Sequence, residues 1–482
     1  MISASAELIR TSAVSLRPST IAYLGFLVCL GPRVVLVILA PSYGGDGLFY
    51  ETVAQNILQH GCVSLADPAV GQCTPHWGGN QLPGYPLFLA TVWIATGSAK
   101  LAPLLAQSAL YAAAAAYAAW SAARVFGSRP AIALTLVLAL SPVLVAWPRM
   151  ELTESLALAG TVWVFSAAIR SVGEQRVRWL ELGTAFALGV LVRYDFALMA
   201  APVMVVALSA ARPSAVIRAA ALAAAVGALP AGLWWARSVA AGLPSVPPLG
   251  LTSAGDPAPP GVLQWMGTWV GGQYELPYSV WPLVTADYTA IRTPDRIHNA
   301  NEAHLIEALR ALPVGAPVPS ELDRQFGVLA SEVRASHPWQ QRLVLPLQRA
   351  GSMWSNPYAS MGWPAEVGGS VRMAFEEAFD DDGVGGALQV ALANTPAAGT
   401  KAVIALWRAL VLSGLTTALL LAAVRRRPVP IFLTASLVFA VVRTAAFSET
   451  VLVETRYLVP AMLWIEASLA LWLGQWRERA GA

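Results

Sequence analysis

Acidic side chains stand just outside apolar segments at several points of this 482-residue chain. Asp46 follows the first apolar segment, Glu151 and Glu154 follow the third, and Glu454 precedes the last. A carboxylate at an apolar boundary can have a raised pKa and can take a proton from an attacking hydroxyl group. These residues are therefore candidates for a general base.

Arginines occupy comparable positions. Arg193, Arg237 and Arg456 each lie beside an apolar segment, on the side where the acids are expected. The guanidinium group is a planar fork that matches phosphate oxygens and can stabilise a phosphate leaving group. Arginines and carboxylates together suit transfer from a lipid phosphate whose tail stays in the bilayer. The alternative is that they form salt bridges that only hold loops together.

The composition is that of an integral membrane protein. Of its residues 56% are hydrophobic and only 12% are charged, with a mean hydropathy of +0.57, whereas soluble domains carry about a quarter charged residues. A net charge of +3 is too small to indicate a nucleic-acid partner. No cluster of His, Cys and Asp has the spacing of metal ligands, so no cofactor is expected, and a divalent metal stays an open alternative.

Ten segments approach the length of about 20 apolar residues that a membrane span requires. They are 20–42, 102–123, 131–148, 155–171, 179–194, 196–211, 219–237, 402–424, 429–446 and 457–475. Arginine-rich connections alternate with arginine-poor ones, so the positive-inside rule places both termini in the cytoplasm and the candidate acids outside. The predicted fold is an all-α polytopic membrane protein with about 10 transmembrane helices.

Two apolar stretches of the first outer loop, 43–101, are too short to cross. The run from Gly84 to Gly97 has about 14 residues, and Tyr50 to Leu58 has apolar residues at helical spacing. Both are predicted to be juxtamembrane helices. Cys62 and Cys73 lie in the same loop, where an oxidising compartment would favour a disulfide between them; two free thiols are the alternative.

The domain plan has three parts. Residues 1–239 are predicted to form an N-terminal transmembrane module, and 402–482 are predicted to form the last helices. The intervening 240–401 is too long for a plain connector and is predicted to be a periplasmic cap. Inside the membrane, Arg33 needs a partner, and we expect an ion pair with Glu181 or Glu466.

Several short motifs resemble those of GT-C glycosyltransferases, in the branch of the protein mannosyltransferases, the lipid A aminoarabinose transferase and the rhizobial galacturonosyltransferases. The first-loop pattern is the most specific: Asp46 with Tyr50, Ala54 and Asn56, followed by Pro83-Gly84-Tyr85-Pro86. Further matches are Leu152-Thr153-Glu154, Leu191-Val192-Arg193, Trp235-Ala236-Arg237 and Glu454-Thr455-Arg456-Tyr457. Residues 240–401 match no family in this way.

The resemblance implies an inverting transfer of a sugar from a polyprenyl-phosphate donor, on the periplasmic side of a bacterial inner membrane. Carried over by motif, Asp46 is the catalytic base and Glu154 the second acid, while Arg456, with Arg237 or Arg193, holds the donor phosphate. The substrate-binding candidates are Tyr50, His76, Tyr85, Glu151, Glu454 and Tyr457. Some relatives have Lys or Arg shortly before the loop proline, where this chain has Asn80-Gln81-Leu82-Pro83.

The expected partners are this lipid-linked donor, membrane lipids and an acceptor that is a lipid, a glycan or a protein. Two other functions remain open. One is a lipid or polysaccharide transporter or flippase, and the other is an O-antigen ligase or polymerase, which uses a pyrophosphate-linked glycan. No internal repeat is evident, although transporters often contain one, and the large, unequal outer loops favour chemistry on the outer face.

Overall fold

The computed structural model describes residues 16–43, 45–65, 82–243, 258–292, 294, 300–355, 363, 369–425, 430–451 and 453–480. Within these residues the regular elements are helices, and the pairing of extended backbone is limited to one isolated bridge between Ser42 and Met150. The predicted all-α class is confirmed.

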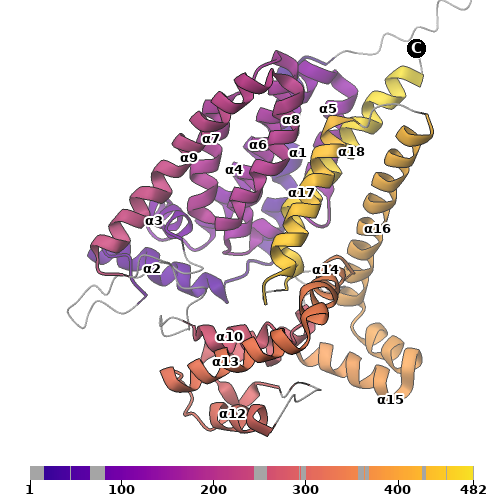
Figure 1. The fold of residues 1–482 in the computed structure, drawn as a ribbon. Coiled ribbons are helices and arrows are strands. Elements are labelled where there is room, and N and C mark those ends of the chain that lie inside the picture. The colour runs from indigo at the N-terminus through magenta and orange to yellow at the C-terminus, as the bar shows by residue number, and fades with distance from the viewer. Residues whose placement is uncertain are drawn as a thin grey trace, which may run out of the picture.

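Seven helices in the described residues are long and apolar enough to cross a membrane. They are α1 (Pro18–Leu39), α4 (Leu101–Phe126), α6 (Thr153–Glu174), α9 (Pro213–Ala240), α16 (Thr395–Val424), α17 (Ile431–Ser448) and α18 (Val459–Ala480), the last preceded by the short η7 (Thr455–Leu458). The other three predicted spans form shorter apolar helices, α5 (Ser128–Leu140), α7 (Trp179–Val192) and η3–α8 (Tyr194–Met199, Ala200–Ala210). Figure 1 shows all of them in one bundle.

The third predicted span ends earlier than expected. Helix α5 stops at Leu140, and Ser141 takes an extended ψ of 120° before Pro142, a residue that disfavours helix at the preceding position. From there to α6 the only helical element is η2 (Trp147–Arg149), and residues 141–149 are all buried. Irregular backbone at membrane depth is tolerated where protein covers it.

Arg33 satisfies the open carbonyl end of this broken helix. Its guanidinium donates to the carbonyl oxygens of Leu138 at 2.9 Å and Cys29 at 2.8 Å, and it lies 3.9 Å from the ring centroid of Tyr111. The predicted ion pair is therefore wrong. Glu181 pairs with Arg178 at 2.6 Å, and Glu466 accepts from the indole of Trp407 at 2.9 Å.

The predicted first outer loop, 43–101, contains α2 (Asp46–His60) and α3 (Gly84–Thr96), which lie at one end of the bundle (Figure 1), as predicted for the two juxtamembrane helices. Gly84 allows α3 to meet the end of α7. A Cβ atom there would lie 2.6 Å from the carbonyl oxygen of Leu191.

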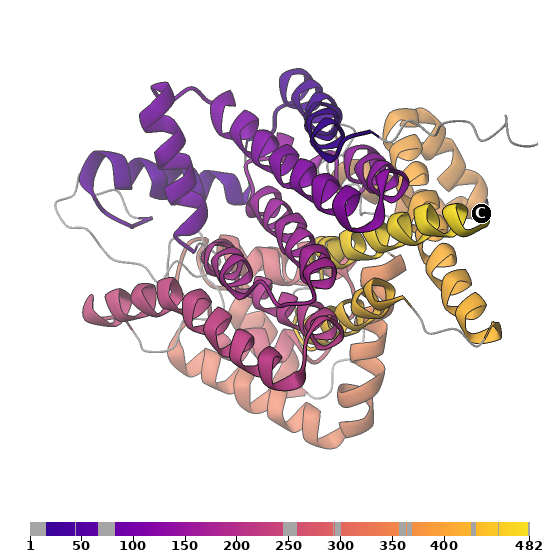
Figure 2. The same ribbon diagram turned by 90° about the horizontal axis from the view of Figure 1, so that it is seen from above.

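The insertion lies at the same end as α2 and α3, below the bundle in Figure 1 and behind it in Figure 2. Its first part, residues 258–336, which we call the cap domain, contains α10 (Pro260–Met266), η4 (Gln273–Tyr278), α11 (Val280–Thr285), η5 (Tyr288–Ala290), α12 (Ala300–Arg310) and α13 (Ser320–Ser336). These helices enclose a hydrophobic core of their own that includes Trp265 and Phe326. Next come η6 (Gln340–Val344), α14 (Leu345–Ser355) and α15 (Gly369–Ala393). The predicted domain limits at 240 and 401 stay a prediction.

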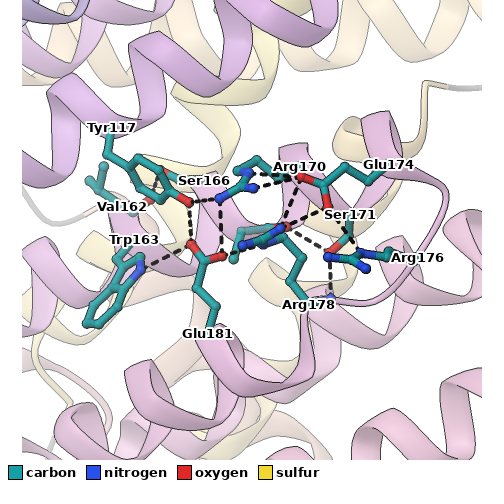
Figure 3. A network of polar contacts seen from close by, with 11 residues as sticks. Tyr117, Val162, Trp163, Ser166, Arg170, Ser171, Glu174, Arg176, Arg178 and Glu181 are labelled. Carbon is teal, nitrogen blue, oxygen red and sulfur yellow. Dashed lines mark hydrogen bonds and ion pairs between the residues drawn. The ribbon is translucent and has the colours of Figure 1, made fainter.

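A polar network fixes the turn between α6 and α7 (Figure 3). Arg170 pairs with Glu174 at 2.7 Å, Arg178 pairs with Glu181, and the Tyr117 hydroxyl donates to Glu181 at 2.7 Å. Helix α6 has 22 residues, so this network lies about 30 Å from the helix start at Thr153. Arginines of this connection thus stabilise the end of the bundle opposite to α2.

Candidate active site

A cavity of about 180 Å³ lies where the starts of α2, α6 and η7 meet the α7–η3 turn. Its walls are formed by Asp46, Tyr50, Leu82, Thr153, Glu154, Val192, Arg193, Tyr194, Asp195, Phe447, Arg456 and Tyr457. It therefore joins the four segments that carry most of the short motifs.

Arg456 is the centre of the charged groups at this cavity. Its Nη1 lies 3.2 Å from Asp46 Oδ2 and 3.6 Å from Glu154 Oε1, and its Nη2 donates to Glu454 Oε1 at 3.2 Å. The Asp46 side chain is 49% exposed, whereas those of Glu154 and Glu454 are 6% and 4% exposed. Of these three carboxylates, only Asp46 is open to an incoming substrate.

Arg193 links the same carboxylates to a second layer. It pairs with Glu154 at 2.7 Å and with Asp195 at 2.8 Å, and Asp195 in turn pairs with the buried Arg443. Glu154 is thus shared by two guanidinium groups. Such an alternating chain of charges keeps both arginines in place in a poorly solvated region.

The Tyr457 ring packs against the guanidinium groups of both Arg193 and Arg456. The guanidinium carbons of Arg193 and Arg456 each lie 5.5 Å from its ring centroid. The Tyr457 ring stacks on Phe447 with centroids 4.3 Å apart and planes inclined by 3°, and its carbonyl oxygen accepts from Arg443 Nε at 2.6 Å.

The charges at the cavity do not balance when every group is ionised. Three guanidinium groups, those of Arg193, Arg443 and Arg456, meet the carboxyl groups of Asp46, Glu154, Asp195 and Glu454. Burial, with the charges of Asp46 and Glu154, raises the pKa of Glu454 against the opposing effect of Arg456. A proton on Glu454 would remove the excess negative charge.

Aromatic contacts fix the position of α2 beside the cavity. The Tyr50 and Tyr85 rings meet edge to face with centroids 5.1 Å apart. The Tyr85 hydroxyl donates to Gln107 Oε1 at 3.0 Å, and Gln107 Nε2 donates to the Pro148 carbonyl at 2.8 Å. Burial raises the pKa of both tyrosines, so their hydroxyl groups remain protonated.

Glu151 lies outside the cavity, in the loop that supports α2. Burial, followed by a hydrogen bond and the charge of Glu51, raises the pKa of the Glu151 carboxyl to about 9. Two carboxyl groups can hydrogen-bond only when one of them holds a proton. We therefore interpret the Glu151 carboxyl group beside Glu51 as protonated at neutral pH.

The structure brings together seven of the predicted site residues: Asp46, Tyr50, Glu154, Arg193, Glu454, Arg456 and Tyr457. Tyr85 and Glu151 support the site without lining the cavity. Arg237 does not line it either, and its guanidinium lies 4.9 Å from the ring of Trp234 on the same helix. His76 and Cys73 lie outside the described residues; Cys62 is disulfide-bonded and Cys29 is free.

Two charged residues of the site were missing from the predicted set. Asp195 stands two residues after Arg193, and Arg443 lies inside the predicted span 429–446. A charged residue in an apolar span is a functional signal by itself, and it could have drawn attention to Arg443. Among the residues that the structure describes, no group of three or more His, Cys, Asp or Glu side chains could hold a metal ion.

Residues 81–235 match the family model of the dolichyl-phosphate-mannose-protein mannosyltransferases. The matched segment includes Glu154 and Arg193, which the cavity joins to Asp46 and Arg456. This match supports membership of the chain in the GT-C superfamily of glycosyltransferases. The resemblance seen in the sequence motifs is thus confirmed at the level of the superfamily. A glycosyltransferase is an enzyme, so the alternative of a protein that only transports lipid or polysaccharide is not pursued further.

A solved structure is also similar to this glycosyltransferase. It is a crystal structure of ArnT from Cupriavidus metallidurans bound to undecaprenyl phosphate, with 15% sequence identity and a TM-score of 0.39. The match covers 93% of this chain and 77% of that chain. A TM-score of this size does not establish a common fold, so the family assignment rests on the matched sequence segment. No curated protein sequence matches the glycosyltransferase.

Proposed function

We propose that this glycosyltransferase transfers a sugar from a polyprenyl-phosphate donor to an acceptor hydroxyl group on the outer face of a bacterial inner membrane, with inversion at the anomeric carbon. The observation that carries the proposal is the half-exposed Asp46 carboxylate, 3.2 Å from Arg456 at the mouth of an arginine-lined cavity.

Asp46 is proposed as the general base. It accepts the proton of the acceptor hydroxyl group while the hydroxyl oxygen forms a bond to the anomeric carbon. The bond from that carbon to the donor phosphate oxygen breaks, and its electron pair stays on the phosphate. Attack opposite to the leaving phosphate inverts the anomeric carbon. Asp46 suits this role because the other two acids beside Arg456 are buried.

Arg456 and Arg193 are proposed to stabilise the negative charge that develops on the phosphate. Both guanidinium groups line the cavity, and Glu154 between them fixes their spacing. A phosphate group that enters would replace Asp46 as the outer partner of Arg456 and so release the base. Preorganised charges in a poorly solvated cavity are an effective way to stabilise a transition state.

The family match and the position of the site support the proposed donor class. The description of the matched family names dolichyl phosphate mannose, and dolichyl phosphate is a polyprenyl phosphate. The cavity lies at the ends of membrane-length helices α6, α17 and α18, where a phosphate attached to a membrane-embedded chain would be found. The arginine-rich α6–α7 turn lies at the opposite end, which by the positive-inside rule is cytoplasmic.

The test is the Asp46→Asn variant of the full-length chain in membranes of its expression host. We expect the consumption of polyprenyl-phosphate sugars, measured by mass spectrometry of the lipid extract, to fall by a factor of about 10² to 10⁴, because the general base is lost. Binding of undecaprenyl phosphate should persist. Asp381→Asn, an exposed acid-to-amide change on α15, is the matched control.

Unchanged sugar transfer in Asp46→Asn would refute the assignment of the base. Consumption of pyrophosphate-linked glycans, in place of monophosphate-linked sugars, would support the ligase or polymerase alternative. The same mass spectra separate the two donor classes.

A further inference from the structure

The cap domain contacts the segment that carries Arg456, although none of the described residues between 258 and 355 lines the cavity. Gln273, the first residue of η4, reaches across to Thr455. Its Oε1 accepts a hydrogen bond from the Thr455 backbone amide and another from the Thr455 hydroxyl group, each at 3.2 Å.

The acceptor that Gln273 provides is one that the turn itself lacks. Thr455 begins η7, and the preceding Glu454 makes no side-chain cap hydrogen bond. Amide groups at a helix start need an acceptor from elsewhere. Because Thr455 and Arg456 are neighbours in one turn, the bond to Thr455 fixes the backbone from which the Arg456 side chain extends.

Gln273 is itself held in place. Its backbone amide donates to Ser352 Oγ at 3.4 Å. The buried Arg349 donates to the carbonyl oxygens of Val270 at 2.8 Å and Gly267 at 2.7 Å, and to that of Ser448 at 3.2 Å. Arg349 therefore connects the cap loop before Gln273 to the end of α17.

The 454–457 turn is thus held from two sides. From the membrane side, Arg443 and Phe447 of α17 hold Tyr457. From the cap side, Gln273 holds Thr455. We propose that Gln273 is a positioning residue through which the cap domain keeps Arg456 directed into the cavity. This inference rests on the proposed role of Arg456 at the donor phosphate.

The experiment compares three variants of the full-length chain in nanodiscs. Gln273→Met keeps the side-chain length but has no carbonyl acceptor, Gln273→Glu keeps the acceptor, and Gln325→Met is a matched change on α13 of the cap domain. The readouts are hydrogen exchange at the Thr455 amide and binding of undecaprenyl phosphate by native mass spectrometry.

In Gln273→Met we expect exchange at Thr455 to become about tenfold faster and undecaprenyl phosphate to bind about tenfold more weakly, because the Thr455 amide and hydroxyl groups both lose their shared acceptor. Gln273→Glu and Gln325→Met should stay within about twofold of the unmodified chain. Rescue by Glu separates positioning through the acceptor from simple filling of space.

The inference is overturned if Gln273→Met exchanges and binds like the unmodified chain, or if Gln273→Glu is as defective as Gln273→Met. If Arg456→Ala loses binding while Gln273→Met does not, the positioning role alone is refuted. A different result would refute the donor role of Arg456: the Thr455 amide exchanges faster in Gln273→Met, but undecaprenyl phosphate binds unchanged to both Gln273→Met and Arg456→Ala. The inferred effect of Gln273 on donor binding would then be refuted as well.

Discussion

Asp46 and Glu154 contact the same guanidinium nitrogen of Arg456, yet they differ in what they can do. Glu154 is buried and lies between two arginines, so its charge is fully engaged. Among the described residues Asp46 has one ion-pair partner, Arg456 at 3.2 Å, and its side chain is half exposed. The solvent exposure of the carboxylate and the number of its arginine partners therefore distinguish Asp46, the proposed base, from Glu154, which holds the two arginines in place.

The carboxyl pair formed by Glu151 and Glu51 leads to a prediction about stability and pH. The pKa of Glu151 is about 9 in the folded chain and about 4.5 in the unfolded chain. The pair thus contributes stability that is fully present below pH 4.5 and is lost as the pH rises through about 9. We expect the melting temperature of Glu151→Gln to decline less between pH 5 and 9 than that of the unmodified chain.

Thermal unfolding in detergent, measured across this pH range, tests the prediction. Glu307→Gln, at an exposed position on α12, is the control and should decline as the unmodified chain does. Parallel declines in Glu151→Gln and the unmodified chain would refute the protonated carboxyl pair.

Among the elements, the contact between α3 and α7 decides where Arg193 lies. Arg193 directly follows α7, and the start of α3 approaches the α7 backbone closely enough that a Cβ atom at Gly84 would lie 2.6 Å from the Leu191 carbonyl oxygen. Backbone atoms cannot move aside as a flexible side chain can. The α3–α7 contact thus connects the first outer loop to the arginine of the cavity.

Gly84→Ala is therefore predicted to destabilise the protein by about 1–3 kcal/mol and to slow sugar transfer, because α3 and the end of α7 must separate. Melting temperature and the rate of donor consumption are the measurements. Gly232→Ala on α9, where a Cβ atom would meet no atom within 4 Å, should have neither effect. A Gly84→Ala protein as stable as the unmodified chain would contradict the close approach.

At the scale of the whole molecule, the described residues form two large hydrophobic cores and a small cluster of Met353, Val453 and Leu458, where the insertion meets the bundle. One core lies in the helix bundle, and the other lies in the cap domain around Trp265 and Phe326. The two are joined near the site by hydrogen bonds of Gln273 and Arg349. Burial lowers the pKa of Arg349 to about 10, yet the group stays protonated at neutral pH. Cores that share few apolar contacts can lose their structure separately.

We predict that Phe326→Ala, which removes a fully buried ring from the cap core, destabilises the cap domain by about 3–5 kcal/mol and leaves the bundle folded. Limited proteolysis should then cut first within 258–336, while the bundle fragments remain intact. Simultaneous degradation of both parts would show that they unfold as one unit. Val328→Ala, at a 46% exposed position on α13, is the control.

The membrane class, the positions of most spans and the motif segments that carry the site could be predicted from the sequence, because hydropathy and charge order are local properties of the chain. The cavity joins Asp46, Glu154, Arg193 and Arg456, all of which stand in such motifs. Arg237 stands in a similar motif but lies elsewhere, since a motif gives no information on the direction of a side chain.

Only the tertiary structure decided which charges meet. Asp46 and Arg456 are 410 positions apart in the chain, and Arg443 and Asp195 are 248 apart. The partners of Arg33 could not be predicted from the sequence, because α5 ends at Leu140 and leaves the Leu138 carbonyl oxygen open to the Arg33 guanidinium. Hydropathy determines that a segment enters the membrane, but the packing of helix on helix determines which side chains then lie within hydrogen-bonding distance.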